Sequence, residues 1–163
     1  MVRAGIIDDE LRLELVDGVL IEMTPPGPRH SGVVAWLNER LVIGAQGRFG
    51  VRVQDAFLTG EYGFRSPDLM VIEPIGRDRL PDAALLIVEV AHTSHARDLA
   101  KASVYAAAGV REYWIVDVAR NEVLVHREPR AAAYASVERL VSGDHITPLL
   151  DVPPVDVAAL LAP

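Results

Sequence analysis

Residues 83–90, with the sequence Ala-Ala-Leu-Leu-Ile-Val-Glu-Val, form the most apolar run of the chain. A strand of this composition has no polar face, whereas a strand in a sheet that is open to water alternates apolar and polar residues. The run therefore predicts a strand at 85–91 that is buried on both faces. The chain has 163 residues, half of them apolar, which suffices for one domain with a core but hardly for two.

Turn and cap signals predict a hairpin and two helices around this strand. Asp17-Gly18 suits a two-residue turn, so the N-terminus predicts a β-hairpin between residues 11–15 and 19–23. After the Pro-rich segment 24–28, Ser31 can cap a first helix, which ends at the glycines 44 and 47. A second helix is predicted at 96–108, with Thr93 or Ser94 as its cap and Gly109 at its end.

The other predicted strands complete a layered fold. They lie at residues 51–58, 68–72, 113–118, 123–127, 136–141 and 145–149, the last two as a hairpin. This order predicts an α/β (α+β sandwich) fold, in which a mixed β-sheet is flanked by helices. We expect one domain over 1–163, with the N-terminal hairpin at 1–23, the core at 29–127, and a C-terminal hairpin and tail at 134–163.

Several classes of protein are disfavoured by composition. No stretch approaches the roughly 18 uninterrupted apolar residues of a membrane span, and the first residues lack the layout of a signal peptide. We therefore expect a cytoplasmic protein with no membrane partner. The absence of cysteine excludes disulfides, thiolate metal sites and cysteine nucleophiles.

The net charge of −7 is unevenly distributed. Residues 24–79 carry seven arginines against six acids, and the segments on either side are each acidic. A nucleic-acid binder usually presents a concentrated basic face, which this chain lacks. The arginines of the middle segment could form a local patch, although solvated surface positions are the simpler explanation: Arg29, Arg40, Arg48, Arg52 and Arg65. We expect tight binding of nucleic acid to require a homodimer or another protein.

Three charged residues stand out. Glu89 lies inside the apolar run, where a carboxylate costs several kcal/mol unless it is protonated, paired or metal-bound. Asp68 follows Pro67, and an aspartate after a proline is also common at turns. Lys101 is the single lysine among sixteen basic residues, which indicates that arginine cannot replace it. The alternatives are a structural pair of Glu89 with an arginine and a surface pair of Lys101 with Asp98.

The predicted elements allow these residues to converge. Asp68 begins one strand and Glu89 lies near the end of the next, so neighbouring strands would bring both acids to one edge of the sheet. Asp98, Lys101 and Tyr105 share a helix face. Two carboxylates can hold a hard cation, and an ammonium can act on water and phosphate, which is the chemistry of phosphodiester cleavage.

Several motifs occur in a fixed order along the chain. They begin with the segment 14–23, Pro25-Pro26 and His30, and continue through Pro67-Asp68-Leu69, Ile87-Val88-Glu89-Val90, Asp98-Leu99-Ala100-Lys101 to Tyr105, Gly109-Val110 and 112–117. With these motifs the chain resembles the Uma-type restriction endonucleases, a bacterial family. The resemblance implies a restriction-endonuclease-like core of the PD-(D/E)XK nuclease superfamily.

The resemblance also implies roles for individual residues. Asp68 and Glu89 match the metal ligands, with Mg²⁺ as the cofactor and Mn²⁺ as a substitute. The usual lysine of the superfamily would stand two places after the glutamate, where this chain has Ala91, and Lys101 matches the lysine that the Uma-type pattern takes from the following helix. Glu14, Gln54 and His30 match recurring positions that line the same cleft, and His30 can equally serve the start of the helix.

The sequence therefore predicts a metal-dependent endonuclease acting on DNA, with Asp68, Glu89 and Lys101 as catalytic residues. Placed on an exposed helix face, Lys101→Ala would abolish cleavage and leave folding nearly intact. The main alternative is an inactive nuclease fold that serves as an interaction or assembly module. A Ser-His-Asp hydrolase is weakly supported by Ser94 with His92 and His95, because no Gly-x-Ser-x-Gly motif is present.

Overall fold

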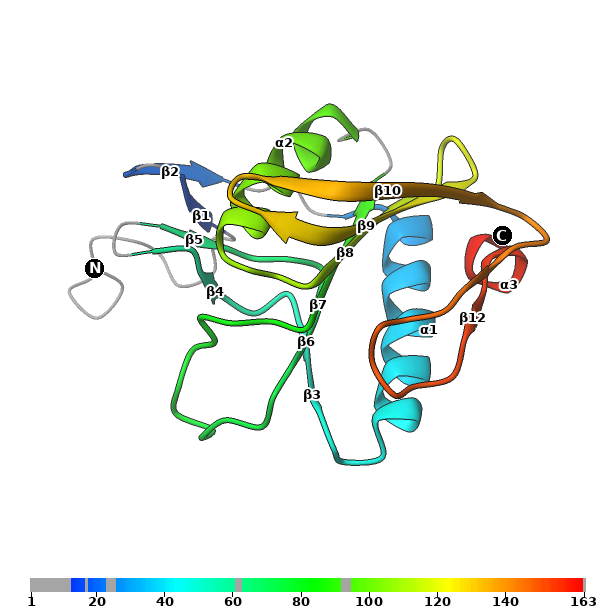
Figure 1. The fold of residues 1–163 in the computed structure, drawn as a ribbon, viewed down its shortest axis with the longest axis horizontal. Helices are drawn as coiled ribbons and strands as arrows, with labels where there is room; N and C mark the ends of the chain where they lie inside the picture. Colours follow the sequence, from blue (N-terminus) through cyan, green and yellow to red (C-terminus); the bar gives the residue numbers. More distant parts are fainter. Residues whose placement is uncertain (1–12, 17, 23–25, 61–62, 92–94, 163) are drawn as a thin grey trace.

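The computed structural model describes residues 13–16, 18–22, 26–60, 63–91 and 95–162 (Figure 1). Within these residues, six strands form a mixed central sheet in the order β10-β9-β8-β7-β6-β3. The pairing is parallel between β7 and β8 and antiparallel between the other neighbours. The strands are β3 (Gly50–Val53), β6 (Leu69–Ile72), β7 (Leu86–Ala91), β8 (Glu112–Asp117), β9 (Glu122–Arg130) and β10 (Ala133–Val141).

Helices cover both faces of this sheet. Helix α1 (Pro28–Ala45) and the short α3 (Val157–Leu161) pack on one face, and α2 (His95–Ala107) packs on the other (Figure 1). All six residues of β7 are buried, with Val88 in the core on the α1 side and Ile87 in the core on the α2 side. The prediction of a strand buried on both faces is thus confirmed. No helix in the described part of the chain combines the length and apolarity needed to cross a membrane.

A smaller sheet contains the N-terminal hairpin. Its strands have the order β2-β1-β5-β4, and they are β1 (Leu13–Val16), β2 (Val19–Glu22), β4 (Phe57–Leu58) and β5 (Phe64–Arg65). Val16 pairs with Val19, and Gly18 between them has a φ of 81°, which glycine adopts at little cost. The predicted N-terminal hairpin is therefore confirmed, and β5 is a strand that the sequence pattern did not predict.

The ends of the helices differ in part from the prediction. Helix α1 begins at Pro28 rather than after Ser31, with Gly27 as a cap that offers no side-chain hydrogen bond. Proline suits the first helical position because its missing N–H has no intrahelical partner there, so the prediction of Ser31 as cap is wrong. Gly109 follows α2 with a φ of 74°, as predicted. Thr93 and Ser94 lie outside the described residues.

Two strand predictions are also wrong. The strand expected at 51–58 is broken by Gln54, whose φ of 50° lies in the left-handed region. The expected hairpin between 136–141 and 145–149 does not form, because β10 pairs with β9 and β11 (His145–Ile146) pairs with β12 (Val155–Asp156). A two-residue turn that joins Arg130 to Ala133 directs β10 back along β9. Ala131 in this turn has a φ of 52°, which its sequence does not signal.

Gly44 allows α1 to approach the C-terminal segment closely. A Cβ at Gly44 would lie 2.8 Å from Cδ of Pro153 and 3.2 Å from Cβ of Val152, whereas a Cβ at Gly32 on the same helix would meet nothing within 4 Å. We expect Gly44→Ala to lower the free energy of unfolding by about 1–2 kcal/mol, because overpacking outweighs the gain in helix propensity. Gly32→Ala should raise it by about 0.5–1 kcal/mol. Urea denaturation measures both, and a Gly44→Ala variant as stable as Gly32→Ala would contradict this close packing.

Candidate functional site

The two predicted acids lie at one end of the β6–β7 ladder. Leu69 pairs with Val88, and one further antiparallel step brings Asp68 opposite Glu89. The backbone N–H of Val90 donates to Oδ2 of Asp68 over 2.9 Å. Both carboxylates are buried, with 7% of Asp68 and 4% of Glu89 exposed. These neighbouring strands therefore bring the two residues together where the β6–β7 ladder ends.

Helix α2 directs the single lysine toward Glu89. Nζ of Lys101 donates to Oε1 of Glu89 over 2.9 Å, and the hydroxyl of Tyr105, one turn later, donates to the same oxygen over 2.7 Å. Lys101 is only 6% exposed, so the alternative of a solvated surface pair is wrong. The side chain of Asp98 lies outside the described part of the structure.

Strand β1 adds a third acid from the smaller sheet. Oε1 of Glu14 lies 3.3 Å from Nζ of Lys101 and accepts the backbone N–H of Ser66 over 3.2 Å. Glu14 is 2% exposed. The ammonium thus lies between two buried carboxylates, one from each sheet. Such buried charges are tolerated only when they are paired and hydrogen-bonded, so the three residues depend on one another.

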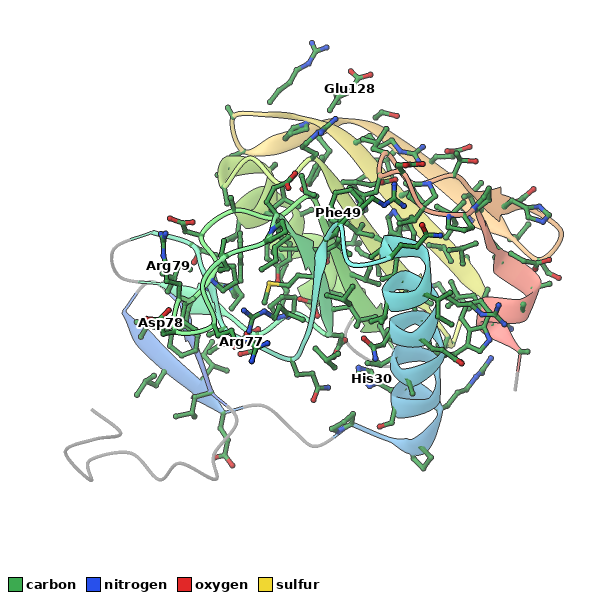
Figure 2. The ribbon with its side chains drawn as sticks, turned by 90° about the horizontal axis from the view of Figure 1, so that it is seen from below. His30, Phe49, Arg77, Asp78, Arg79 and Glu128 are labelled. Atoms are coloured by element: carbon green, nitrogen blue, oxygen red, sulfur yellow. The ribbon has the colours of Figure 1, made fainter. Side chains whose placement is uncertain are left out.

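Two further residues contact Asp68 from the α1 side and from the end of β3. Nε2 of His30 lies 2.9 Å from Oδ2 of Asp68, and Figure 2 shows His30 beside the first turn of α1. The amide of Gln54 donates to Oδ1 of Asp68 over 3.4 Å. Its left-handed backbone is a strained conformation of the kind that concentrates at functional sites. The structure therefore places Glu14, His30 and Gln54 around the same pair of acids.

The hydroxyl of Tyr105 donates a hydrogen bond to Glu89 and stays protonated. Burial raises the pKa of the Tyr105 hydroxyl well above its ordinary value, and the nearby charge of Glu89 raises it further. The phenol consequently keeps its proton at neutral pH. Its ring centroid lies 5.0 Å from that of Tyr113 and 6.1 Å from that of Phe57. This aromatic packing holds α2 against the sheet at the position of Lys101.

Other predicted residues lie elsewhere. Ala91, at the usual place of the lysine, is fully buried in the core under α2. Val110, Tyr113 and Trp114 are fully buried in the core. His92 and Ser94 are outside the described residues, as is the side chain of His95, so the structure does not test the hydrolase alternative.

Five of the seven arginines of the middle segment make intramolecular contacts. Arg48 pairs with Asp151, and Arg52 lies 3.3 Å from Asp55. Arg65 is buried and donates to the carbonyl of Leu15 over 2.7 Å. The other two of these five are Arg29, which donates to Asn121 and the carbonyl of Leu161, and Arg40, which lies over the ring of Trp36.

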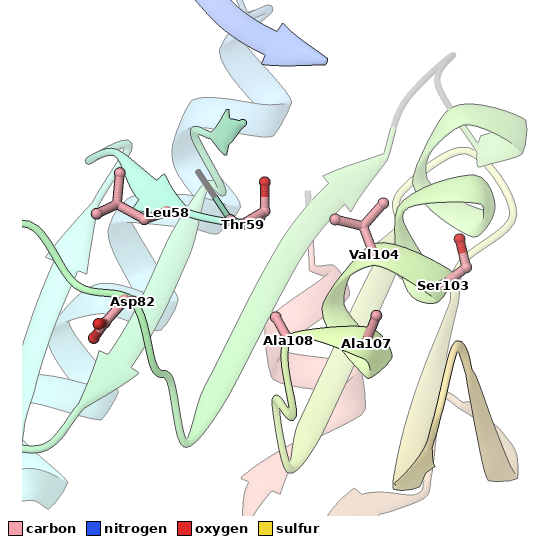
Figure 3. Close-up of a pocket in the computed structure, with 8 residues that line it drawn as sticks. Leu58, Thr59, Asp82, Ser103, Val104, Ala107 and Ala108 are labelled. Carbon is pink, nitrogen blue, oxygen red and sulfur yellow. The ribbon is translucent and has the colours of Figure 1, made fainter. Parts of the chain in front are cut away.

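A cavity of about 680 Å³ lies beside α2 but does not include the cluster of acids (Figure 3). In the close-up, Val104 of α2 lies opposite Thr59 and Leu58, and Ser103 lies next to it on the same helix. Its lining comprises one acid, two hydroxyl groups and small or apolar residues, without a basic side chain: Leu58, Thr59, Gly60, Asp82, Ser103, Val104, Ala107 and Ala108. This composition does not suit a phosphate group.

The donor atoms of the cluster suit a hard divalent cation. Carboxylate oxygens are the ligands that Mg²⁺ and Mn²⁺ prefer. In the part of the chain that the structure describes, no three His, Asp or Glu side chains form a metal-holding group. A cation held by Asp68 and Glu89 would therefore complete its coordination with water, backbone or phosphate oxygens, as Mg²⁺ commonly does.

Comparison with known proteins identifies the family. Residues 4–159 match the Uma2 family, whose description is "Putative restriction endonuclease", and the chain belongs to this family. Among solved structures it is similar to a protein from Anabaena variabilis described as a putative nuclease belonging to DUF820, with a TM-score of 0.82 and 15% identity over 98% of this chain and 95% of that one. The likeness confirms the predicted fold class.

A second solved structure is similar over part of its length. It is the type IIG restriction endonuclease BpuSI, with a TM-score of 0.48 and 20% identity over 71% of this chain and 14% of that one. No curated protein matches the sequence.

The burial of Lys101 changes the expected effect of its removal. The exposed helix face assumed from the sequence is wrong, and Lys101→Ala would leave Glu14 and Glu89 buried without their shared ammonium. We expect a loss of about 3–5 kcal/mol in the free energy of unfolding, as for other broken buried pairs. Ser103→Ala, at an exposed position of the same helix, should change it by less than about 0.5 kcal/mol. Urea denaturation at pH 7 gives both values, and a loss below 1 kcal/mol for Lys101→Ala would be incompatible with the buried pair.

Proposed function

We propose that this protein is a metal-dependent endonuclease that hydrolyses phosphodiester bonds of DNA, with Asp68, Glu89 and Lys101 as its catalytic residues. The observation that carries the proposal is the buried contact of Lys101 with Glu89, opposite Asp68 at the edge of the sheet. Residues far apart in the chain lie together there, and two carboxylates with an ammonium are the groups that metal-dependent phosphodiester cleavage would use. The family description and the fold support a nuclease.

Asp68 and Glu89 would hold the cation, which is Mg²⁺ with Mn²⁺ as a substitute. When bound, a divalent cation lowers the pKa of a coordinated water and polarises the phosphate. The two acids come from adjacent strands of a rigid sheet, which fixes their relative position. A rigid pair of ligands suits a cation that demands near-ideal octahedral geometry.

Lys101 would orient the attacking water or stabilise the charge that develops on the phosphate. Its ammonium is held by Glu89 and Glu14, and the hydroxyl of Tyr105 shares the same oxygen of Glu89. An ammonium placed in advance needs no reorganisation when charge develops during the reaction. The guanidinium of arginine can keep a buried positive charge, but because it is planar and larger it would not place its donors at the position of the ammonium.

The hold on DNA would be weak in a single copy of the chain. The net charge is −7, and five of the seven arginines of the middle segment contact acids, carbonyls, an amide or an aromatic ring of the same chain. Phosphate neutralisation by basic side chains supplies most of the affinity in nucleic-acid complexes. We infer that tight binding requires a homodimer or a second protein.

The same charge distribution favours one alternative function. A nuclease fold with an acidic surface could serve as an interaction or assembly module whose catalytic cluster is only structural. The two functions differ in the requirement for metal. A module would bind neither Mg²⁺ nor Mn²⁺ near millimolar concentration, and Glu89→Gln would not change its partners.

Substitutions at the cluster test the catalytic proposal. We expect Lys101→Arg to keep a buried cation and a folded protein, while Mg²⁺-dependent cleavage of DNA falls by about 10²–10³-fold. Glu89→Gln should abolish cleavage and weaken Mn²⁺ binding in calorimetry. The control is Glu73→Gln, an exposed acid at the far end of β6, which should change neither. Unchanged cleavage in Lys101→Arg and Glu89→Gln would rule out the catalytic assignment.

A further inference from the structure

His30 contacts Asp68 from the helix that lies on the opposite face of the sheet to α2. Its Nε2 is 2.9 Å from Oδ2 of Asp68, and the two side chains are 13% and 10% exposed. The same oxygen accepts the backbone N–H of Val90 over 2.9 Å. Oδ2 of Asp68 is therefore engaged by two partners within hydrogen-bond distance, one from α1 and one from β7.

The second ring nitrogen of His30 distinguishes two roles, that of a metal ligand and that of a residue that positions Asp68. Nδ1 is buried and has no hydrogen-bond partner within the described residues. A histidine that binds a metal through Nε2 almost always donates its Nδ1–H to a carboxylate, carbonyl or water. At His30 a protonated Nδ1 would be a buried donor without an acceptor, which costs about 1–3 kcal/mol.

The contact with Asp68 also fixes the position of the proton. With the proton on Nδ1, the lone pair of Nε2 would face the negative Oδ2 of Asp68 at 2.9 Å, which is repulsive. With the proton on Nε2, the ring donates a charge-assisted hydrogen bond to the carboxylate. The geometry therefore favours the Nε2–H form, in which Nε2 has no lone pair to offer a metal.

We propose that His30 is a positioning residue and not a metal ligand. It donates from Nε2 to Oδ2 of Asp68, together with the N–H of Val90, and leaves Oδ1 to face the cation. Among the described residues, Oδ1 has only the long contact of 3.4 Å with the side-chain amide of Gln54, beyond the usual range of about 2.7–3.2 Å. The inference rests on the proposed function, and it gives the cation a shell of oxygen ligands. Mg²⁺ and Mn²⁺ prefer such ligands, whereas a softer metal such as Ni²⁺ suits imidazole nitrogen.

The tautomer of His30 tests this role in the metal-free protein. Long-range ¹H–¹⁵N spectra of the ¹⁵N-labelled chain distinguish the two forms, and His30→Gln identifies the resonances of this ring. We expect the Nε2–H form, with an Nε2 proton protected from exchange by its hydrogen bond. A ring of the Nδ1–H form, or one that samples both forms equally, would overturn the proposal.

Mn²⁺ binding separates positioning from ligation. Glutamine can place an amide N–H near the position of Nε2 but is a poor metal ligand, so His30→Gln should bind Mn²⁺ almost as the wild type does in calorimetry. His30→Ala should bind about 10–100-fold more weakly, as when an outer-shell partner is lost. Equal losses in both variants, with a directly bound ¹⁴N coupling in the wild-type Mn²⁺ electron spin echo spectrum, would show that His30 is a ligand.

The two experiments keep this inference separate from the proposed function. A wild-type protein that binds no Mn²⁺ would refute the metal-dependent nuclease, and the tautomer would still show whether His30 donates to Asp68. If His30→Ala fails to fold, the comparison of wild type with His30→Gln and the tautomer spectra remain decisive.

Discussion

The ion pair between Lys101 and Glu89 is the interaction on which the rest of the site depends. Both side chains are almost completely buried, and burying two charges costs several kcal/mol for each ion unless the geometry is good and other hydrogen bonds are satisfied. The structure meets this condition with Glu14 and Tyr105. The N-terminal hairpin, the central sheet and α2 thereby contact one another through one buried cluster of charged side chains.

This requirement explains the arrangement of the elements around the site. Strand β7 is buried on both faces, so a carboxylate on it can be satisfied only by groups brought in from other layers. Helix α2 supplies Lys101 on one side, and α1 supplies His30 to the neighbouring Asp68 on the other. Side chains of α1 and of α2 can both reach this pair of acids where the β6–β7 ladder ends.

The sequence was sufficient for the features that depend on local composition and strand order. The apolar run predicted β7, and chain order showed that Asp68 and Glu89 would meet if their strands were neighbours, which β6 and β7 are. Features set by three-dimensional contacts were missed. Helical periodicity showed that Lys101 and Tyr105 share a face, but it could not show that this face is buried, because the covering residue Glu14 is distant in sequence. The left-handed conformations of Gln54 and Ala131 occur in residues that give no turn signal.

The most direct measurement of the central claim is a crystal structure of the protein soaked in Mn²⁺, with anomalous density calculated around the acids. The account predicts a single peak between Asp68 and Glu89, with Oδ1 of Asp68 and a carboxylate oxygen of Glu89 as its protein ligands and the ammonium of Lys101 within the same pocket. Absence of a peak there at saturating Mn²⁺, or a lysine side chain that extends into solvent, would contradict it.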